Sequence, residues 1–298
     1  MQVCHRIDEL LSCVEKLKQE NKTIGLLPTM GALHQGHLSL AKRAKEENDV
    51  LICSVFVNPI QFNNKEDLEK YPRNLEADLE ELKSVDCDVV FAPSAEEVYA
   101  EEPTEKYTFG ALEEVLEGPQ RPGHFNGVAT IVHKLFKWSK ADKAYFGEKD
   151  YQQIAIIKDL VRQYEIPIQI VECPIFRDPD GLATSSRNVR LSPKAREIAP
   201  KIHEILVKSA NLAPNMSYSQ IKSFVECEFK IRKDFELEYF EIVDAKTLQP
   251  IRRPSDNGAV GCVAVWLDGV RLIDIQKYYT DTLNPILNTE NQNQVSVN

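Results

Sequence analysis

The stretch TIGLLPTMGALHQGHLSLAKRAKEEN, residues 23–48, decides the fold. It opens with a short apolar run at 23–29, which predicts a buried strand, and closes with a helix-like run at 37–48. A turn that contains glycine joins the two. Strand, turn and helix in this order are the repeating unit of doubly wound α/β domains, so we expect a parallel sheet covered by helices.

The turn in this stretch has the glycine spacing of a phosphate-binding loop, because four residues separate Gly31 from Gly36. A nucleoside-triphosphate P-loop would continue with lysine and a serine or threonine, whereas this chain continues with His37 and Leu38. A second histidine stands at His34. Imidazoles at a helix start can donate hydrogen bonds to phosphate oxygens, and a protonated one adds positive charge. Spacing alone leaves open an ordinary turn that happens to hold two histidines.

The rest of the first half repeats the alternation of strands and helices. A continuous apolar run of the kind that a covered parallel strand requires appears once more at 50–57. We expect helices at 7–20, 65–84 and 152–164, and further strands at 88–92, 144–147 and 167–175. The pattern predicts a Rossmann-like doubly wound parallel sheet, which binds ligands beyond the carboxyl ends of its strands.

The pattern changes after residue 175. Helices are expected at 192–210 and 219–231, followed by strands at 237–245, 258–267 and 270–275, the last two joined by an Asp-Gly hairpin turn. We therefore predict a Rossmann-like domain at 1–175, a smaller α+β C-terminal domain at 176–283, and a polar, disordered tail at 284–298.

Composition limits the function classes. The 298 residues carry a formal net charge of −10, which argues against non-specific nucleic-acid binding but not against an anionic substrate in a local basic pocket. The seven cysteines are scattered and form no CxxC, which indicates reduced thiols. Neither a signal peptide nor a membrane span is recognisable, so we expect an intracellular protein.

Three later turns carry polar side chains suited to a ligand. Asn58 and Gln61 offer neutral donors and acceptors for a small polar substrate, and Lys149 in FGEKDYQQ could contact phosphates. The serines and arginine of TSSRN, residues 184–188, suit phosphate oxygens. The glycine-rich stretch RPGHFNGV, residues 121–128, could line a pocket or be an ordinary loop. Taken singly, each motif also fits a plain turn or linker.

Two acidic runs look unrelated to any site. EADLEELK at 76–83 and AEEVYAEEP at 95–103 are expected to be solvated helix faces rather than paired catalytic carboxylates.

The order and spacing of the motifs resemble the pantothenate synthetase (pantoate–β-alanine ligase) family, a branch of the nucleotidyltransferase-like HxGH superfamily. The resemblance covers the chain except its terminal tail, and it rests on PTMGALHQGH, FVNPIQF, RPGHFNGV, FGEKDYQQ, TSSRN and YFEIVDAKTLQP. It implies condensation of pantoate with β-alanine, using ATP and Mg²⁺, through an enzyme-bound pantoyl-adenylate. It also implies a cytoplasmic homodimer in the coenzyme A route, acting without nucleic acid or membrane.

The resemblance assigns roles residue by residue. It implies catalytic roles for His34, His37 and Lys149. In the family His37 is often described as the proton donor, and the sequence leaves open which of the two histidines donates. It implies binding of pantoate by Gln61 and Gln153 with Asn58 close by, and of β-alanine by Gln61. It implies contact with ATP for Met30, Gly31, Ala32, Leu33, His34, Gln35, Gly36, His37, Gly147, Glu148, Lys149, Asp150, Phe176, Thr184, Ser185, Ser186 and Arg187.

Two details complete these expectations. Phe176 stands where the family usually has a smaller aliphatic residue, which matters little if it meets the nucleotide through its backbone. Residues 185–187 would come from the second domain, which would close as a lid over the triphosphate and exclude water. The sequence indicates no magnesium ligands.

Other functions compete with this one. An adenylyl- or cytidylyltransferase of the same superfamily would stop after nucleotidyl transfer to a phosphorylated substrate. A class I aminoacyl-tRNA synthetase also has an HxGH element, but this chain is short and acidic and has no KMSKS-like segment. A non-catalytic nucleotide-binding regulator could keep the fold, although intact His34, His37, Lys149 and Arg187 speak against it.

Overall fold

The computed structural model describes residues 1–101 and 104–278. The chain divides into two compact units, Met1–Arg190 and Leu191–Asn298. The boundary therefore follows Arg190, whereas the sequence placed it after residue 175. The physical reason is that the segment before the boundary is tied to the first unit: Ser186 donates a hydrogen bond to the carbonyl of Ala32, and Arg190 binds Asp67. The tail expected at 284–298 lies outside the described residues.

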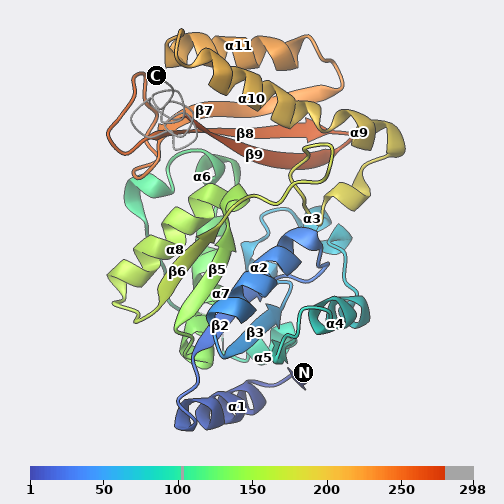
Figure 1. The fold of residues 1–298 in the computed structure, drawn as a ribbon, viewed down its shortest axis with the longest axis vertical. Helices are drawn as coiled ribbons and strands as arrows, with labels where there is room; N and C mark the ends of the chain where they lie inside the picture. The colour runs from blue at the N-terminus through green and yellow to red at the C-terminus, as the bar shows by residue number, and fades with distance from the viewer. Residues whose placement is uncertain (102–103, 279–298) are drawn as a thin grey trace, which may run out of the picture. The chain divides into compact units, whose positions relative to one another are not determined.

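The first unit contains a parallel sheet of six strands in the order β1-β4-β3-β2-β5-β6 (Figure 1). Its strands are β1 Gln2–Cys4, β2 Ile24–Thr29, β3 Val50–Val55, β4 Val89–Phe91, β5 Lys143–Gly147 and β6 Gln169–Cys173. The chain leaves β2 toward β3 and β4 on one side and later returns to β5 and β6 on the other. This reversal beside β2 is the place where such sheets bind ligands. The expected doubly wound fold is confirmed.

Helices cover both faces of this sheet. The α-helices of the unit are α1 Ile7–Gln19, α2 Gln35–Glu47, α3 Lys65–Lys70, α4 Leu75–Lys83, α5 Ala95–Val98, α6 Glu117–Gln120, α7 His124–Ser139 and α8 Tyr151–Gln163. The 3₁₀ turns η1 to η4 span Pro59–Gln61, Gly110–Leu112, Glu148–Asp150 and Asn188–Arg190.

The alternation of side chains along each strand separates two cores. Leu26 and Ile52 pack on the side of α1, α7 and α8. Their neighbours Leu27 and Leu51 pack on the opposite side, against α2 and α4. Because both faces are buried, the central strands are apolar throughout, which is the continuous pattern seen at 50–57.

Among the elements that the sequence did not indicate are a strand and a long helix. Strand β1 pairs with β4 at one edge of the sheet. The stretch RPGHFNGV does not form a loop throughout, because α7 begins at His124 and continues to Ser139. Most residues of α7 are buried, and those that are not, Asn126, Lys134, Lys137 and Trp138, form only a narrow face of the helix.

The second unit is an antiparallel sheet of three strands with helices packed on it. Its elements are α9 Pro193–Ile198, α10 Lys201–Leu212, α11 Tyr218–Lys230, β7 Phe235–Asp244, β8 Ala259–Leu267 and β9 Val270–Tyr278. The expected long helix is interrupted near Pro200, which is the N-cap of α10. The expected hairpin joins β8 to β9, with Asp268 and Gly269 both at positive φ, as the favoured two-residue turn requires.

Two further observations concern the whole described chain. All seven cysteines are free thiols. Within residues 1–101 and 104–278, no helix combines the length and the apolar character that spanning a membrane demands.

Candidate active site

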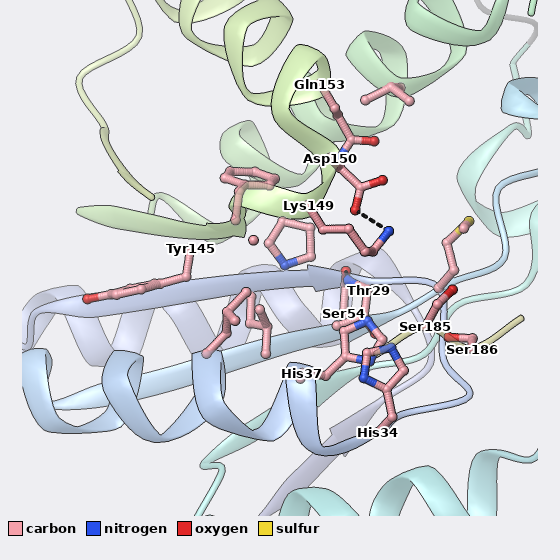
Figure 2. A pocket seen from close by; sticks show the side chains of 18 of the residues that line it. Thr29, His34, His37, Ser54, Tyr145, Lys149, Asp150, Gln153, Ser185 and Ser186 are labelled. Atoms are coloured by element: carbon pink, nitrogen blue, oxygen red, sulfur yellow. Dashed lines mark hydrogen bonds and ion pairs between the residues drawn. The ribbon is translucent and has the colours of Figure 1, made fainter. Parts of the chain in front are cut away.

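A pocket opens at the carboxyl ends of β2, β3 and β5, within the first unit (Figure 2). It collects most of the residues that the sequence singled out. Those that line it are Met30, His34, Gly36, His37, Asn58, Gln61, Gly147, Lys149, Asp150, Gln153, Phe176, Thr184, Ser185, Ser186 and Arg187. The remaining candidates do not line it and are Gly31, Ala32, Leu33, Gln35 and Glu148.

The two histidines lie against each other at the start of α2. His34 is the N-cap residue of this helix, and its ring stacks on that of His37 with centroids 3.9 Å apart. Their spacing of three residues places them one above the other on the first helical turn, as Figure 2 shows. The Nδ1 atoms of both rings are buried and have no hydrogen-bond partner among the described residues. Each ring therefore keeps hydrogen-bonding capacity for a ligand.

Burial keeps both histidines neutral in the ligand-free protein. Burial, with a smaller contribution from the nearby Lys149 cation, lowers the pKa of His34 to about 4. Burial also places the pKa of His37 well below its ordinary value, and His34 and Lys149 add to the shift. The histidines thus meet a ligand as neutral hydrogen-bonding groups, and the resident positive charge of the pocket comes from Lys149 and Arg187.

The turn before the histidines is not shaped like a P-loop cradle. The backbone N–H groups of Ala32 and Leu33 donate to the carboxylate of Asp78, at 3.0 and 2.7 Å. The N–H of Gly31 donates to the hydroxyl of Thr29. Because protein groups already occupy these amides, an anion would meet the start of α2 and the imidazoles rather than the turn.

The two glycines serve packing and conformation. Gly31 has φ +78°, and a Cβ there would lie 2.7 Å from a carboxylate oxygen of Asp78. A Cβ at Gly36 would lie 2.9 Å from the ring of His34. Ala32 also has a positive φ, 50°, which is unfavourable for a residue with a side chain. The hydrogen bond from Ala32 to Asp78 helps to hold this conformation.

Lys149 reaches the pocket from the end of β5. It lies in η3, directly after Gly147, and its Nζ is 3.0 Å from a carboxylate oxygen of Asp150. Figure 2 shows the lysine on the far side of the strand ends from the stacked histidines, with Gln153 one turn further along. The lysine side chain is 20% exposed, so its charge is directed into a largely enclosed space.

Asn58 and Gln61 form a hydrogen-bonded pair at the end of β3. The side-chain amide of Asn58 donates to Oε1 of Gln61 and to the carbonyl of Gly127, both at 3.0 Å. Oδ1 of Asn58 accepts from the hydroxyl of Tyr99 at 2.6 Å. Nε2 of Gln61 is left facing the sulfur of Met30, a weak acceptor, at 2.9 Å. Asn58 is only 1% exposed, so it supports Gln61 rather than offering its own amide to a ligand.

The stretch 184–187 closes another side of the pocket. The guanidinium of Arg187 donates to Asp67 at 2.7 Å and lies 5.8 Å from the centre of the Tyr71 ring. The same carboxylate accepts from Arg190, so one anion balances two cations. The carbonyl of Phe176 accepts from the N–H of Thr184, which fixes the two ends of this loop to each other.

Sequence reasoning missed Asp78, which it assigned to a solvated helix face. The residue is 4% exposed, and burial raises its pKa against the opposing effect of the two backbone amides. A signal was present: Leu75, Asp78, Leu79 and Leu82 follow the i, i+3, i+4, i+7 spacing of a buried helix face. A carboxylate on such a face needs a partner, here the turn before His34.

Comparison with known proteins gives a consistent result. The family model for pantoate–β-alanine ligase matches residues 2–277. Pantothenate synthetases of Bacteroides fragilis and Phocaeicola vulgatus are 50% and 52% identical to this chain over 279 and 280 residues, and each alignment covers 93% of this chain and 99% of the relative.

Solved structures agree. The pantothenate synthetase of Thermus thermophilus superposes with a TM-score of 0.89 at 39% identity, covering 94% of this chain and 100% of that one. The ligase of Francisella tularensis, solved with β,γ-ATP and β-alanine, gives a TM-score of 0.79 at 37% identity, covering 94% and 98%. The chain thus belongs to the pantoate–β-alanine ligase family and is a ligase enzyme.

Proposed function

We propose that the pocket condenses pantoate with β-alanine at the expense of ATP, through an enzyme-bound pantoyl-adenylate, to give pantothenate, AMP and pyrophosphate. The observation that carries this proposal is the meeting of two kinds of group in one pocket. His34, His37, Lys149 and Arg187 provide donors and charge for a triphosphate. Gln61 offers a neutral amide for an organic acid. The Francisella tularensis relative, solved with β,γ-ATP and β-alanine, supports it.

The chemistry requires two displacements. In the first, a carboxylate oxygen of pantoate bonds to the α-phosphorus while the bond from that phosphorus to the bridging oxygen breaks, releasing pyrophosphate. In the second, the amine of β-alanine bonds to the acyl carbon, AMP leaves with its oxygen, and the amine loses a proton. No residue forms a covalent bond with substrate, and no cysteine is among the described residues that line the pocket.

Positioning and charge stabilisation then account for most of the catalysis. Lys149 and Arg187 offset the repulsion between an anionic carboxylate and an anionic phosphate. We assign His34 and His37 to phosphate oxygens, to which neutral imidazoles donate hydrogen bonds. Negative charge close to His37 favours its protonated form, so the bound triphosphate raises its pKa toward the range in which it can give a proton to the leaving group.

The donor set fits a magnesium ion that is held chiefly by substrate. Mg²⁺ commonly binds one or two carboxylates together with phosphate oxygens and water. Asp150 is the single carboxylate among the described residues that line the pocket, and no group of three potential ligand side chains occurs in the described chain. Asp150 would therefore hold the ion, which would neutralise phosphate charge.

Further parts of the proposal rest on the family resemblance. The second unit would act as a lid that keeps water from the acyl-adenylate. It would do so without residues 176–190, which belong to the first unit. The protein would work as a cytoplasmic homodimer without nucleic acid or membrane, and analytical ultracentrifugation of the purified chain tests the dimer.

The deciding experiment incubates the purified protein with ATP, Mg²⁺, pantoate and β-alanine, and follows pyrophosphate, AMP and pantothenate. All three should appear in equal amounts, and omission of β-alanine should leave pantoyl-adenylate on the enzyme. Pyrophosphate release with phosphopantetheine in place of pantoate would instead favour a nucleotidyltransferase. Absence of AMP with every substrate would favour a non-catalytic nucleotide-binding protein.

A further inference from the structure

The hydrogen bonds around Asn58 have a direction, and that direction is set by a group that cannot change. The carbonyl of Gly127 accepts from the side chain of Asn58, and a backbone carbonyl can only accept. The atom of Asn58 that faces Gly127 must therefore be its nitrogen. The usual ambiguity between oxygen and nitrogen in a side-chain amide is removed at this position.

Tyr99 fixes the other end of the same side chain. Its hydroxyl lies 2.6 Å from Oδ1 of Asn58, and because that oxygen can only accept, the hydroxyl must donate. Burial raises the pKa of Tyr99, so the phenol keeps its proton. The nitrogen and the oxygen of the Asn58 amide are thus assigned by different neighbours, and the two assignments agree.

The remaining hydrogen of the Asn58 amide sets the orientation of Gln61. It points to Oε1 of Gln61 at 3.0 Å, so the NH₂ group of Gln61 faces the sulfur of Met30, a weak acceptor, and the pocket that both residues line. The backbone at Gln61 is also held, since its carbonyl lies 2.9 Å from Nδ1 of His124. A Cβ at Gly127 would lie 2.6 Å from Cα of Gln61, so α7 packs directly on this turn.

We propose that Tyr99 and Asn58 are positioning residues that lock Gln61 as a hydrogen-bond donor toward the pocket, so that this site selects the carboxylate of an acid substrate and disfavours an ammonium group. The inference rests on the proposed function, which places an organic acid beside Gln61. Two acids are available, pantoate and β-alanine, and both carry the required carboxylate. The amine of β-alanine must then approach from another side of the pocket.

The test compares three variants of the full-length enzyme. Tyr99→Phe removes one hydroxyl and keeps the ring. Asn58→Ala removes the lock and lets Gln61 turn either way. Asn58→Asp, assayed at alkaline pH where the new carboxylate is ionised, favours the reversed orientation, in which the Gln61 amide donates to residue 58 and shows its oxygen to the substrate.

We expect the Michaelis constant of one acid substrate to rise about threefold in Tyr99→Phe and more than about tenfold in Asn58→Asp, with Asn58→Ala between them, as the loss or reversal of one hydrogen bond implies. The constant for ATP should change less than about twofold. Whichever acid constant rises identifies the substrate that Gln61 holds. Tyr164→Phe is the matched control, because this tyrosine is exposed and contacts its neighbours through its ring.

Three outcomes would overturn the inference: unchanged acid constants in Tyr99→Phe and Asn58→Asp, an equal rise for ATP, or a larger effect in Asn58→Ala than in Asn58→Asp. Melting temperatures exclude variants that fail to fold. Calorimetric titration of pantoate and β-alanine into each variant provides the same ranking without turnover. A wild-type protein that binds neither acid contradicts the proposed function, whereas binding without the ranking contradicts only the lock.

Discussion

The turns that follow β2 and β3 treat their polar side chains in opposite ways. After β2, the half-buried His34 and His37 each keep a buried Nδ1 atom that has no hydrogen-bond partner among the described residues. After β3, every polar atom of the Asn58 side chain is engaged by a neighbour. The difference separates two tasks. A side chain that stabilises charge developing during the reaction needs a hydrogen-bonding atom that no protein group occupies. A side chain that recognises the shape and polarity of a substrate is better held in one orientation before the substrate binds.

The largest effect on turnover is expected at the histidines that follow β2. His37→Ala should lower turnover by about 100-fold, because it removes the group that we assign to a phosphate oxygen and to proton donation. Turnover is measured by pyrophosphate release at saturating substrates, and circular dichroism checks the fold. The exposed His5, changed to Ala, is the matched control. Equal turnover in wild type and His37→Ala would remove this residue from the catalytic set.

The next largest effect on turnover is expected at Asp78, which holds the turn at residues 30–33, directly before His34 (the histidine turn). Asp78→Asn should lower turnover by about tenfold, because displacement of a catalytic group by a fraction of its size is costly. It should also lower the free energy of unfolding by about 1–3 kcal/mol, since one of two partly buried backbone N–H groups loses its acceptor. Steady-state kinetics and urea unfolding provide the two numbers.

Two further variants test whether Asp78 acts by holding the backbone. Glu76→Gln removes an exposed carboxylate from the same helix and should change neither quantity. Ala32→Gly should restore part of the turnover lost in Asp78→Asn, because glycine adopts the positive φ of position 32 without strain. Failure of this rescue would mean that Asp78 does more than hold the backbone.

A substitution in the turn that follows β3 should change the Michaelis constant of one substrate selectively. Gln61→Ala should raise the Michaelis constant of pantoate by about tenfold and that of ATP by less than about twofold, because it deletes one donor at the acid end of the pocket. Initial rates at varied pantoate and ATP separate the two. Gln163→Ala, at an exposed position of α8, is the control. A larger effect on ATP would place Gln61 at the wrong end of the pocket.

The smallest effect is on stability. Unfolded histidine takes up a proton near its ordinary pKa of 6.5, whereas folded His34 does so only near about 4. The unfolded state therefore binds more protons between these values, and ligand-free protein should become less stable as pH falls from 6.5 toward 4. His34→Gln should reduce the loss of melting temperature between neutral pH and about pH 5. A loss of the same size in wild type and His34→Gln would refute the assignment.

Much of the fold followed from periodicity, and the exceptions have physical causes. The strands at 23–29 and 50–57 were apparent because both of their faces are buried and a long apolar run results. Helix α7 was missed because it is buried on most sides, so that the polar positions Asn126, Lys134 and Lys137 mark only a narrow face. The boundary after Arg190 depends on contacts between distant residues, which spacing cannot indicate.

In the candidate site, too, some residues were predictable from the sequence and others were not. Strand-end turns identified His34, His37, Gln61 and Lys149, and the structure brings all four to one pocket. Their ligands stay predictions. The supporting residues were hidden, because Asp78 and Tyr99 lie in runs whose other acidic side chains, among the described residues, are mostly exposed. A support acts through one contact to a segment far along the chain, and only the folded arrangement discloses it.

The neutral state of the stacked histidines has a consequence for the enthalpy of ATP binding and for proton uptake. If the arriving triphosphate raises the pKa of His37, the complex takes up protons from solution as it forms. The buffer must supply them, so the heat of ATP binding should vary with the ionisation enthalpy of the buffer, and the slope counts the protons taken up. In His37→Ala that slope should decrease, which makes the histidine turn observable before any bond to phosphorus is made or broken.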